Sequence, residues 1–300
     1  MEKEMGIIHM KLSELEFYLE DFLAYCQNKN LSRKTISSYE QSLKLFIVYL
    51  KKEHDIDKVK EVRTGHIRQY INYVQDRGKY TVVSRESTKN INFPENRTDF
   101  KKQVSSITIN NYIRNIKVLF NWLRQEGELQ KNPVDNISQI KTVRRQKKGI
   151  SKEEFNNLIE YFDYTKFHGY RNKVVVLLLQ VTGMRIGECL ELEVDAIDFK
   201  NKMILVTKTK GNKERYVYFS NVMQRELKQY LKFKDRYIDT QLLFPTTKGT
   251  NLTIQSFEKQ LKDVGKKAGI DVHPHQIRNN FARHYLLNGG DFYTLSHSWS

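Results

Sequence analysis

Cysteine is scarce in this sequence, and apolar runs of membrane-spanning length are absent. The 300 residues contain two cysteines, Cys26 and Cys189, which lie far apart and match neither a disulfide framework nor a zinc-ligand spacing. The longest apolar run, Val174 to Leu179, is far too short to cross a bilayer and is typical of a buried helix. Glu2 and Glu4 interrupt the N-terminus, so no signal peptide is visible. We therefore expect a protein of the reducing cytoplasm with no membrane segment.

Acidic residues are also few in relation to basic ones. Lys and Arg number 51 against 35 Asp and Glu, which gives a formal net charge of +16. Such an excess favours a polyanionic partner, because each phosphate that a cation neutralises releases counterions. A membrane-surface binder and a merely basic soluble protein are the alternatives, but the basic residues lie among motifs that suit phosphate. We therefore expect nucleic acid as the partner.

The first part of the chain has the periodicity of a helical domain, which we place at residues 11–133. Ser32 is a predicted N-cap, and the apolar residues after it recur at steps of three and four, which gives one buried stripe. The same spacing predicts three more helices, near residues 13–27, near 64–76 and from Ser106 onward. Residues 78–103 are polar, and we predict an inserted loop there that either touches DNA or is solvated.

Residues 134–150 lose this periodicity, and we interpret them as a linker between two domains. The linker carries a basic run made of Lys141, Arg144, Arg145, Lys147 and Lys148. Such a run is either a solvated tether or a strap across a phosphate backbone, and the net charge favours the strap. The residues predicted to bind DNA are Arg144, Arg145, Lys147 and Lys148 of this run, together with Lys34 of the first domain.

Residues 151–300 form the second predicted domain, which mixes helices with a little β structure. Ser151 and Glu154 fit a capping box at its start. The apolar spacing then predicts helices near residues 171–181, 186–192, 221–234, 254–268 and 275–287. Residues 203–206 and 216–219 have β character and flank a Lys-Gly turn, which predicts a hairpin. The expected fold is mainly α with a small antiparallel sheet.

Three places in the second domain carry groups that suit a phosphate. Gly183 permits a tight turn, so Arg185 would project from the start of a new helix, where anions are favoured. Lys210 lies in the turn of the predicted hairpin, where it could protonate a leaving oxygen. His275 and Arg278 are three residues apart on a predicted helix and so face one side. Two arginines, a lysine and a histidine are the groups that stabilise a phosphorus centre in transfer.

Each of these signals alone also has an ordinary structural explanation. Arg185 could form a surface ion pair with Glu188, which could equally orient the guanidinium from behind. Lys210 could be an exposed turn lysine, and the last pair could be a helix-start histidine and a surface arginine. A metal site is not indicated, because the histidines near residue 275 have no matching cluster of Asp, Glu or Cys.

The order of the motifs resembles the tyrosine recombinase (phage integrase) family. The matching segments are Thr182-Gly183-Met184-Arg185, Glu188-Cys189-Leu190-Glu191-Leu192 with Asp195, Lys210-Gly211, Lys213-Glu214-Arg215, His275-Gln276-Ile277-Arg278 and Phe281-Ala282. Ser32-Arg33-Lys34-Thr35 and Tyr39 in the helical first half are similar to that family's core-binding domain. The motifs are individually loose but specific as an ordered set.

This resemblance implies that DNA is cut by a tyrosine that attacks phosphorus and forms a 3′-phosphotyrosyl link. Arg185 and Arg278 would clamp the scissile phosphate, Lys210 would protonate the 5′-oxygen, and His275 would assist as an acid or base. The arginines bring the positive charge that a metal would otherwise bring, so no metal and no other cofactor is implied. The implied partners are double-stranded DNA and further copies of the chain in a tetramer, in the integration or recombination of a mobile element.

The nucleophile is the part of the pattern that the sequence does not match. The family has a Leu-Gly-His segment and then the tyrosine well beyond the second arginine, whereas 22 residues follow Arg278 here and the match breaks at His297. We expect a truncated or frameshifted chain without the nucleophile. The alternatives are a fragment that ends in another reading frame and a substitute nucleophile, for which Tyr285 and Tyr293 are weak candidates.

Two other functions compete with strand cleavage. The first is a non-catalytic DNA-binding protein that occupies recombination sites, and the second is a basic helical protein that binds RNA or acts as a scaffold.

Overall fold

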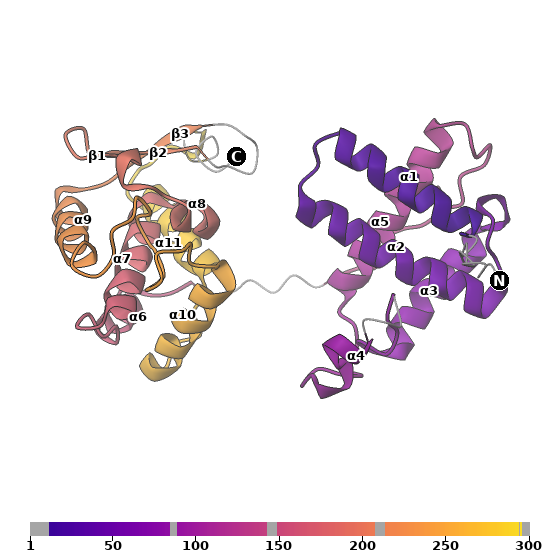
Figure 1. The fold of residues 1–300 in the computed structure, drawn as a ribbon, viewed down its shortest axis with the longest axis horizontal. Helices are drawn as coiled ribbons and strands as arrows, with labels where there is room; N and C mark the ends of the chain where they lie inside the picture. Colours follow the sequence, from indigo (N-terminus) through magenta and orange to yellow (C-terminus); the bar gives the residue numbers. More distant parts are fainter. Residues whose placement is uncertain (1–11, 85–88, 143–148, 208–213, 294, 296–300) are drawn as a thin grey trace, which may run out of the picture. The chain divides into compact units, whose positions relative to one another are not determined.

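The computed structural model describes residues 12–84, 89–142, 149–207, 214–293 and 295. The chain divides into two compact units, residues 1–145 and residues 146–300 (Figure 1). Each unit has its own apolar core, so the two are described separately.

The first unit is helical. Its helices are α1 (Glu14–Asn28), α2 (Arg33–His54), α3 (Thr64–Arg77), the short α4 (Lys89–Asn92) and α5 (Ser106–Gln125). Ser32 caps α2 as predicted, because its side chain accepts a hydrogen bond from the backbone N–H of Thr35 at 3.1 Å. α2 packs against α1, α3 and α5, and the rings of Phe46, Tyr70 and Phe120 meet in the core.

The segment predicted as a polar loop over residues 78–103 contains more structure than its composition indicates. It holds α4 and a 3₁₀ turn at Pro94–Asn96. The backbone N–H of Lys79 donates to the carbonyl of Lys102 at 2.9 Å, and the N–H of Lys101 donates to the carbonyl of Lys79 at 3.1 Å. These hydrogen bonds close the segment at its base, and polar composition alone does not reveal them.

The start of the predicted linker packs on the first unit. Val134 and Ile137 are buried in its core, and the Asn110 amide forms hydrogen bonds with both backbone groups of Ile140 at 2.8 and 2.9 Å. This part of the chain therefore differs from a solvated tether. The basic residues Arg144, Arg145, Lys147 and Lys148 lie outside the described residues.

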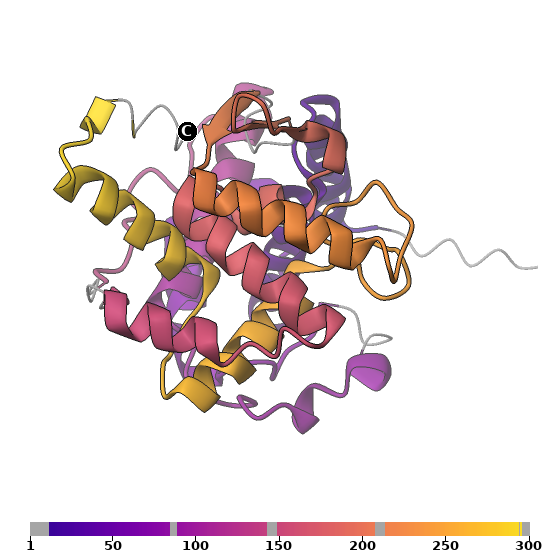
Figure 2. The ribbon, with the colours of Figure 1, turned by 90° about the vertical axis from the view of Figure 1, so that its left-hand side faces the viewer.

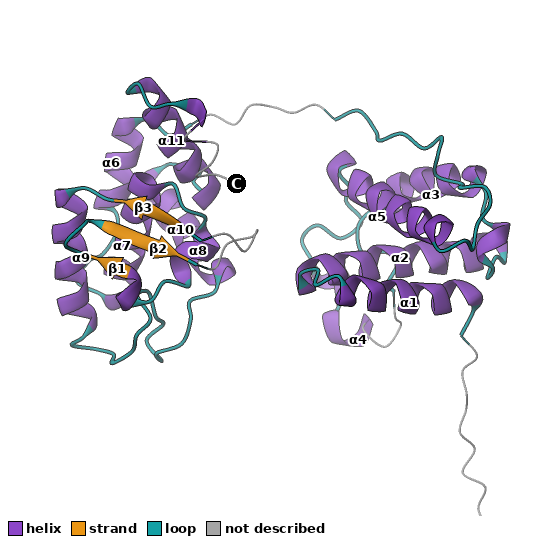
Figure 3. Ribbon diagram, turned by 90° about the horizontal axis from the view of Figure 1, so that it is seen from above, coloured by secondary structure: helices purple, strands orange, loops and turns teal. Residues whose placement is uncertain are grey.

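The second unit combines helices with a small sheet. Its helices are α6 (Lys152–Glu160), α7 (Phe167–Thr182), α8 (Ile186–Leu190), α9 (Asn221–Lys234), α10 (Ile254–Ala268) and α11 (Pro274–Leu287). The strands β1 (Ile197–Asp198), β2 (Met203–Val206) and β3 (Arg215–Tyr218) form an antiparallel sheet in the order β1-β2-β3 (Figure 3). The predicted fold class, mainly α with a small antiparallel sheet, is confirmed, and β1 is an addition to the predicted hairpin.

α7 is the central helix of the second unit, where it packs between α9 and α11 (Figure 2). It contains the apolar run that the sequence indicates as a buried helix, and residues 174–176, 178 and 179 are fully buried. Burial of each such side chain contributes about 1.5–3 kcal/mol, so this helix is the main anchor for the elements around it. Among the described residues, no helix is both long enough and apolar enough to span a bilayer.

Candidate active site

The site begins at the turn between α7 and α8. Gly183 ends α7 in the left-handed region with φ +63°, and Arg185 is the residue directly before α8, as the sequence predicts. A Cβ atom on Gly183 would lie 2.2 Å from the ring of Phe281 on α11. Glycine therefore serves twice here, since it allows the turn and also allows α11 to pack directly against it.

Glu188 lies one turn along α8 and is almost fully buried, with a side-chain exposure of 3%. Its carboxylate accepts a hydrogen bond from the backbone N–H of Arg185 at 2.8 Å and one from the Arg185 guanidinium at 2.9 Å. The contact that the sequence predicts between Glu188 and Arg185 is thus present, and a role of Glu188 in orienting Arg185 remains a prediction. A surface ion pair, the alternative explanation, does not describe this buried carboxylate.

Arg215, the first residue of β3, is the second partner of Glu188. Its guanidinium donates to the two carboxylate oxygens at 2.6 and 3.2 Å, which is the bidentate arrangement that arginine favours. Burial by itself raises the pKa of Glu188, but hydrogen bonds from Arg215 and Arg185 outweigh burial and hold this pKa below its ordinary value. Glu188 is therefore ionised and holds two arginines in place.

Arg278 on α11 is the third guanidinium of this group, and only 7% of it is exposed. Its pKa is lowered to about 10, first by burial and then by the positive charge of Arg185, while Glu188 opposes the shift and Arg215 adds to it. These electrostatic interactions require that the four side chains lie close together. We call Arg185, Glu188, Arg215 and Arg278 the arginine cluster, and its three cations and one carboxylate carry a formal charge of +2.

Three guanidinium groups that share one carboxylate give this part of the site a positive charge, which favours a bound anion. A phosphate diester supplies one negative charge on two non-bridging oxygens, and the negative charge on those oxygens grows as a nucleophile adds to phosphorus. Planar guanidinium groups can donate to both oxygens at once and become more stabilising as that charge grows. The arginine cluster is therefore suited to bind a phosphate and to stabilise its transition state.

His275 lies on α11 one turn before Arg278, as the spacing predicts, and its side chain is exposed near the start of the helix. Lys210 belongs to the segment that joins β2 to β3, where Val206 pairs with Arg215, but the lysine itself lies outside the described residues. The structure thus brings Arg185 and Arg278 together, places His275 on the same helix as Arg278, and leaves the position of Lys210 untested.

Sequence reasoning missed the role of Arg215 and of Asn280. Arg215 appears in the motif after the hairpin turn, but nothing in its spacing links it to Glu188. The Asn280 side chain is buried and bonds both backbone groups of Ile150, accepting from the N–H at 3.2 Å and donating to the carbonyl at 2.6 Å. Asn280 therefore fixes the start of the second unit to α11.

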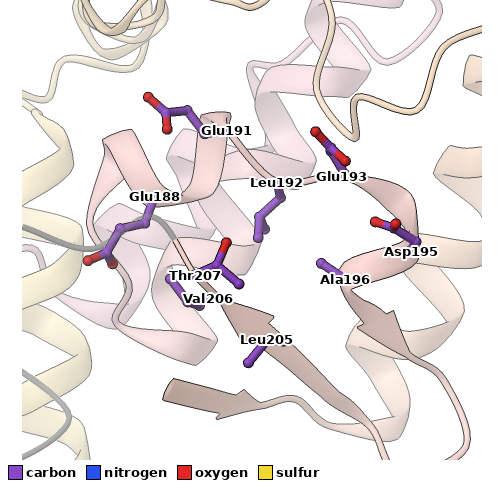
Figure 4. A pocket seen from close by; sticks show the side chains of 9 residues that line it. All are labelled: Glu188, Glu191, Leu192, Glu193, Asp195, Ala196, Leu205, Val206 and Thr207. Atoms are coloured by element: carbon purple, nitrogen blue, oxygen red, sulfur yellow. The ribbon is translucent and has the colours of Figure 1, made fainter. Parts of the chain in front are cut away.

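An acidic pocket of about 340 Å³ adjoins the site on the other side of Glu188. Its lining includes the carboxylates of Glu188, Glu191, Glu193 and Asp195 (Figure 4). In the figure the carboxylate of Glu188 points away from Glu193 and Asp195, in keeping with its hydrogen bonds to arginine. Because Glu191, Glu193 and Asp195 carry negative charge that repels phosphate, the pocket is not the phosphate-binding face. Among the described residues, no group of three or more His, Cys, Asp or Glu side chains is placed to hold a metal ion.

Two family models match the chain along most of its length. The model of the phage integrase family matches residues 148–298, and the model of the phage integrase N-terminal SAM-like domain matches residues 19–91. The chain belongs to the phage integrase family. The arginine cluster and α11 lie inside the first match, and α2 and α3 lie inside the second.

Named relatives of this integrase-family chain are bacterial tyrosine recombinases. It is 26% identical over 289 residues to the tyrosine recombinase XerC of Oceanobacillus iheyensis, a match that covers 93% of this chain and 86% of that protein. It is 27% identical over 292 residues to the tyrosine recombinase XerD of Staphylococcus haemolyticus, with 92% and 87% covered.

Solved structures share the fold of this integrase-family chain. A lambda integrase tetramer bound to a Holliday junction matches with a TM-score of 0.68 at 15% identity and covers 93% of this chain and 75% of that one. The Tn1549 transposon integrase in complex with circular intermediate DNA matches with a TM-score of 0.68 at 16% identity, with 96% and 91% covered. The two-part architecture is thus that of the tyrosine recombinases.

Proposed function

We propose that this chain is a site-specific recombinase that holds the scissile phosphate of double-stranded DNA in its arginine cluster. The observation that carries the proposal is the buried guanidinium of Arg278 beside Arg185, with a formal charge of +2 over the group. Arg185 and Arg278 are the proposed clamp. Glu188 and Arg215 are positioning residues, because they act on the phosphate through Arg185.

The reaction that we propose is the one that the family resemblance implies. The oxygen of a tyrosine forms a bond to phosphorus while the bond from phosphorus to the 5′-oxygen breaks, and the leaving oxygen takes up a proton. Lys210 is the proposed donor of that proton, and His275 is proposed to assist as an acid or base. The arginine cluster stabilises the extra negative charge on the non-bridging oxygens during the transfer.

We propose that the attacking tyrosine is neither Tyr285 nor Tyr293. The ring of Tyr285 packs against Phe281 with centroids 6.0 Å apart, and the backbone at Gly290 folds so closely onto it that a Cβ there would lie 2.3 Å from the ring. Tyr293 is 69% exposed beyond the end of α11. Tyr285 therefore has a packing role.

The DNA contacts that we propose outside the cluster involve basic residues of both units. Lys34 is exposed in the first turn of α2, where it is free of any ion pair among the described residues, and the basic run of Arg144, Arg145, Lys147 and Lys148 lies outside the described residues. We also propose a tetramer on DNA, which is the state in which lambda integrase has been solved with a Holliday junction. Recombination of a mobile element by this chain remains a prediction, because the relatives reported above are the tyrosine recombinases XerC and XerD.

The test is a trapping experiment on a target duplex that is first selected from a random library by binding to the chain. A nicked version of this duplex releases a short fragment after cleavage, so a covalent adduct between protein and DNA accumulates. We expect Arg278→Gln to lose binding to the target, and Tyr285→Phe and Tyr293→Phe to bind the duplex and form adduct as wild type does. An adduct that Tyr285→Phe or Tyr293→Phe abolishes would refute the assignment of the nucleophile. Equal affinity of wild type and Arg278→Gln, or preference for RNA, would refute the proposal as a whole.

A further inference from the structure

A second cationic cavity lies in the first unit, and nothing in the recombination chemistry above uses it. It has a volume of about 600 Å³, which falls in the range of small-molecule sites. Its walls come from α2, the end of α3, the first half of α5 and the described parts of the inserted segment, residues 79–84 and 92–104. Of the described residues that line it, Arg77, Lys79 and Arg97 are cations and none is a carboxylate.

Arg77, the last residue of α3, is the unusual member of this lining. Its Nε and Nη1 atoms are buried, yet neither has a hydrogen-bond partner among the described residues. The nearest recorded interaction of its guanidinium is with the ring of Tyr73, whose centroid is 5.7 Å away. By contrast, Lys79 and Arg97 both pair with Asp99, each at 3.4 Å. Buried polar atoms are nearly always satisfied, so two unsatisfied donors on one cation call for an acceptor that binds from the cavity.

Another polar group near Arg77 has the same deficit. The hydroxyl of Tyr70 is also buried without a hydrogen-bond partner among the described residues. Burial raises the pKa values of Tyr70 and Tyr112, and the charge of Arg77 opposes the rise in both, so its guanidinium lies near these two rings. The region therefore combines a surplus of buried donors with a positive charge.

The wall formed by the inserted segment is held in an uncommon backbone conformation. Three non-glycine residues in it have positive φ, namely Tyr80 at +62°, Phe93 at +38° and Lys101 at +59°. The guanidinium of Arg97 lies 4.3 Å from the centroid of the Tyr80 ring. Left-handed conformations of bulky residues are costly and gather at ligand sites, where the surrounding structure enforces them. The amino-acid composition of this segment does not by itself require these left-handed conformations.

We propose that this cavity binds a phosphate group, with Arg77 as its principal ligand. The Nη1 and Nη2 atoms at the end of an arginine guanidinium can donate to two phosphate oxygens at once, and Nη1 of Arg77 is one of its two buried donors without a hydrogen-bond partner among the described residues. Lys79 and Arg97 add positive charge at the rim, and Tyr80 and Tyr112 leave apolar surface for the remainder of an ester. The phosphate is carried either by a small phosphate ester or by DNA, and the chemistry of recognition is the same for both.

The experiment uses the full chain and two probes, inorganic phosphate and adenosine monophosphate, titrated at constant ionic strength with chloride as the balancing ion. Isothermal titration should show saturable binding at this cavity in addition to any binding at the arginine cluster, and Arg77→Gln should weaken the cavity component alone by about tenfold or more. The matched control is Arg68→Gln, which removes an exposed arginine from the same helix and should leave binding unchanged. Arg77→Lys keeps the charge but not the two-point contact and should bind with intermediate affinity.

Thermal unfolding without phosphate separates a ligand site from a structural role. If Arg77 is a ligand of phosphate, Arg77→Gln should unfold at or above the temperature of Arg68→Gln. Phosphate should raise the midpoint of wild type more than that of Arg77→Gln, because the arginine cluster is intact in both. If phosphate has no more effect than chloride, or raises wild type and Arg77→Gln equally, the proposal is wrong. A large loss of stability in Arg77→Gln without phosphate would likewise overturn it.

Binding to duplex DNA across a salt series identifies the source of the phosphate. If DNA supplies it, Arg77→Gln should reduce the slope of log affinity against log salt by about one, and free phosphate should compete with the duplex. If a small ester supplies it, both slope and DNA affinity should match those of Arg68→Gln. The trapping experiment does not depend on Arg77. If the cavity does not bind phosphate, the proposed recombinase function is unaffected, and if the trapping experiment fails, the proposed phosphate site in the cavity is unaffected.

Discussion

The substitution Glu188→Gln tests whether the arginine cluster depends on its one carboxylate. Glutamine keeps the shape of glutamate, but its amide presents N–H donors where Arg185 and Arg215 also present donors. The variant therefore removes the carboxylate that pairs with Arg185 and Arg215, in a site that also holds the buried guanidinium of Arg278. Removal of one partner from a buried ion pair costs about 3–5 kcal/mol.

The lower end of that range applies here, because Arg185 and Arg215 keep 26% and 16% of their side-chain surface exposed. A loss of about 3 kcal/mol lowers the unfolding midpoint of a unit of this size by roughly 6–12 °C. The control is Glu191→Gln, which removes an exposed carboxylate from the same acidic pocket and should change the midpoint by less than about 2 °C.

The effect of Glu188→Gln should depend on pH and on anions. The pKa of Glu188 is held below its ordinary value of 4.5, so the stability that its charge provides is complete above that value and is lost as pH falls through the lower folded-state pKa. The difference from wild type should thus be constant between about pH 6 and 8 and shrink in more acid solution. Sulfate should rescue the variant more than wild type, because an anion bound to the arginines replaces part of the lost charge. Equal midpoints for Glu188→Gln and Glu191→Gln would refute the reasoning.

Three further substitutions test the support of the site. Gly183→Ala should destabilise by more than about 1 kcal/mol in urea, and by more than Gly269→Ala, because both have positive φ but only Gly183 is packed against a ring. Asn280→Ala should lower the free energy of unfolding by about 1–3 kcal/mol, because it loses two hydrogen bonds to the backbone. Asn279 is exposed, so Asn279→Ala should be nearly neutral, and a reversal of this order would contradict the anchoring role of Asn280. Arg278→Lys should weaken duplex binding without changing its salt slope, since the charge stays but the planar fork is lost; unchanged affinity would show that the fork makes no contact.

Local sequence signals predicted much of the fold. Ser32 and Ser151 were recognisable as N-caps because capping chemistry acts over three residues, and both side chains accept the expected backbone hydrogen bonds. The bounds of α9 and α10 follow from apolar spacing, and they match the predicted ranges 221–234 and 254–268. Helices whose signals are local to the chain were thus predicted well.

These local signals did not predict contacts between segments that are distant in the sequence. Arg215 and Glu188 are separated by 27 residues, and no spacing rule joins a strand residue to a buried helix carboxylate. Gly183 was predicted as a turn residue, but its close contact with Phe281 depends on how α11 packs on α7. The cavity at Arg77 was missed for the same reason, because the polar composition of residues 78–103 hides the backbone pairing that shapes it.

The central claim is that Arg185 and Arg278 hold one and the same phosphate. A direct measurement replaces each phosphate of the selected target duplex in turn by an uncharged methylphosphonate and compares the affinities of wild type, Arg185→Gln and Arg278→Gln. The account predicts a single phosphate position whose replacement strongly lowers the affinity of wild type for the duplex. The same replacement should lower the affinity of both variants only a little, because each variant has already lost its contact with that phosphate. If the two variants couple to different phosphates, or to none, the two guanidinium groups do not share a phosphate and the proposed site is wrong.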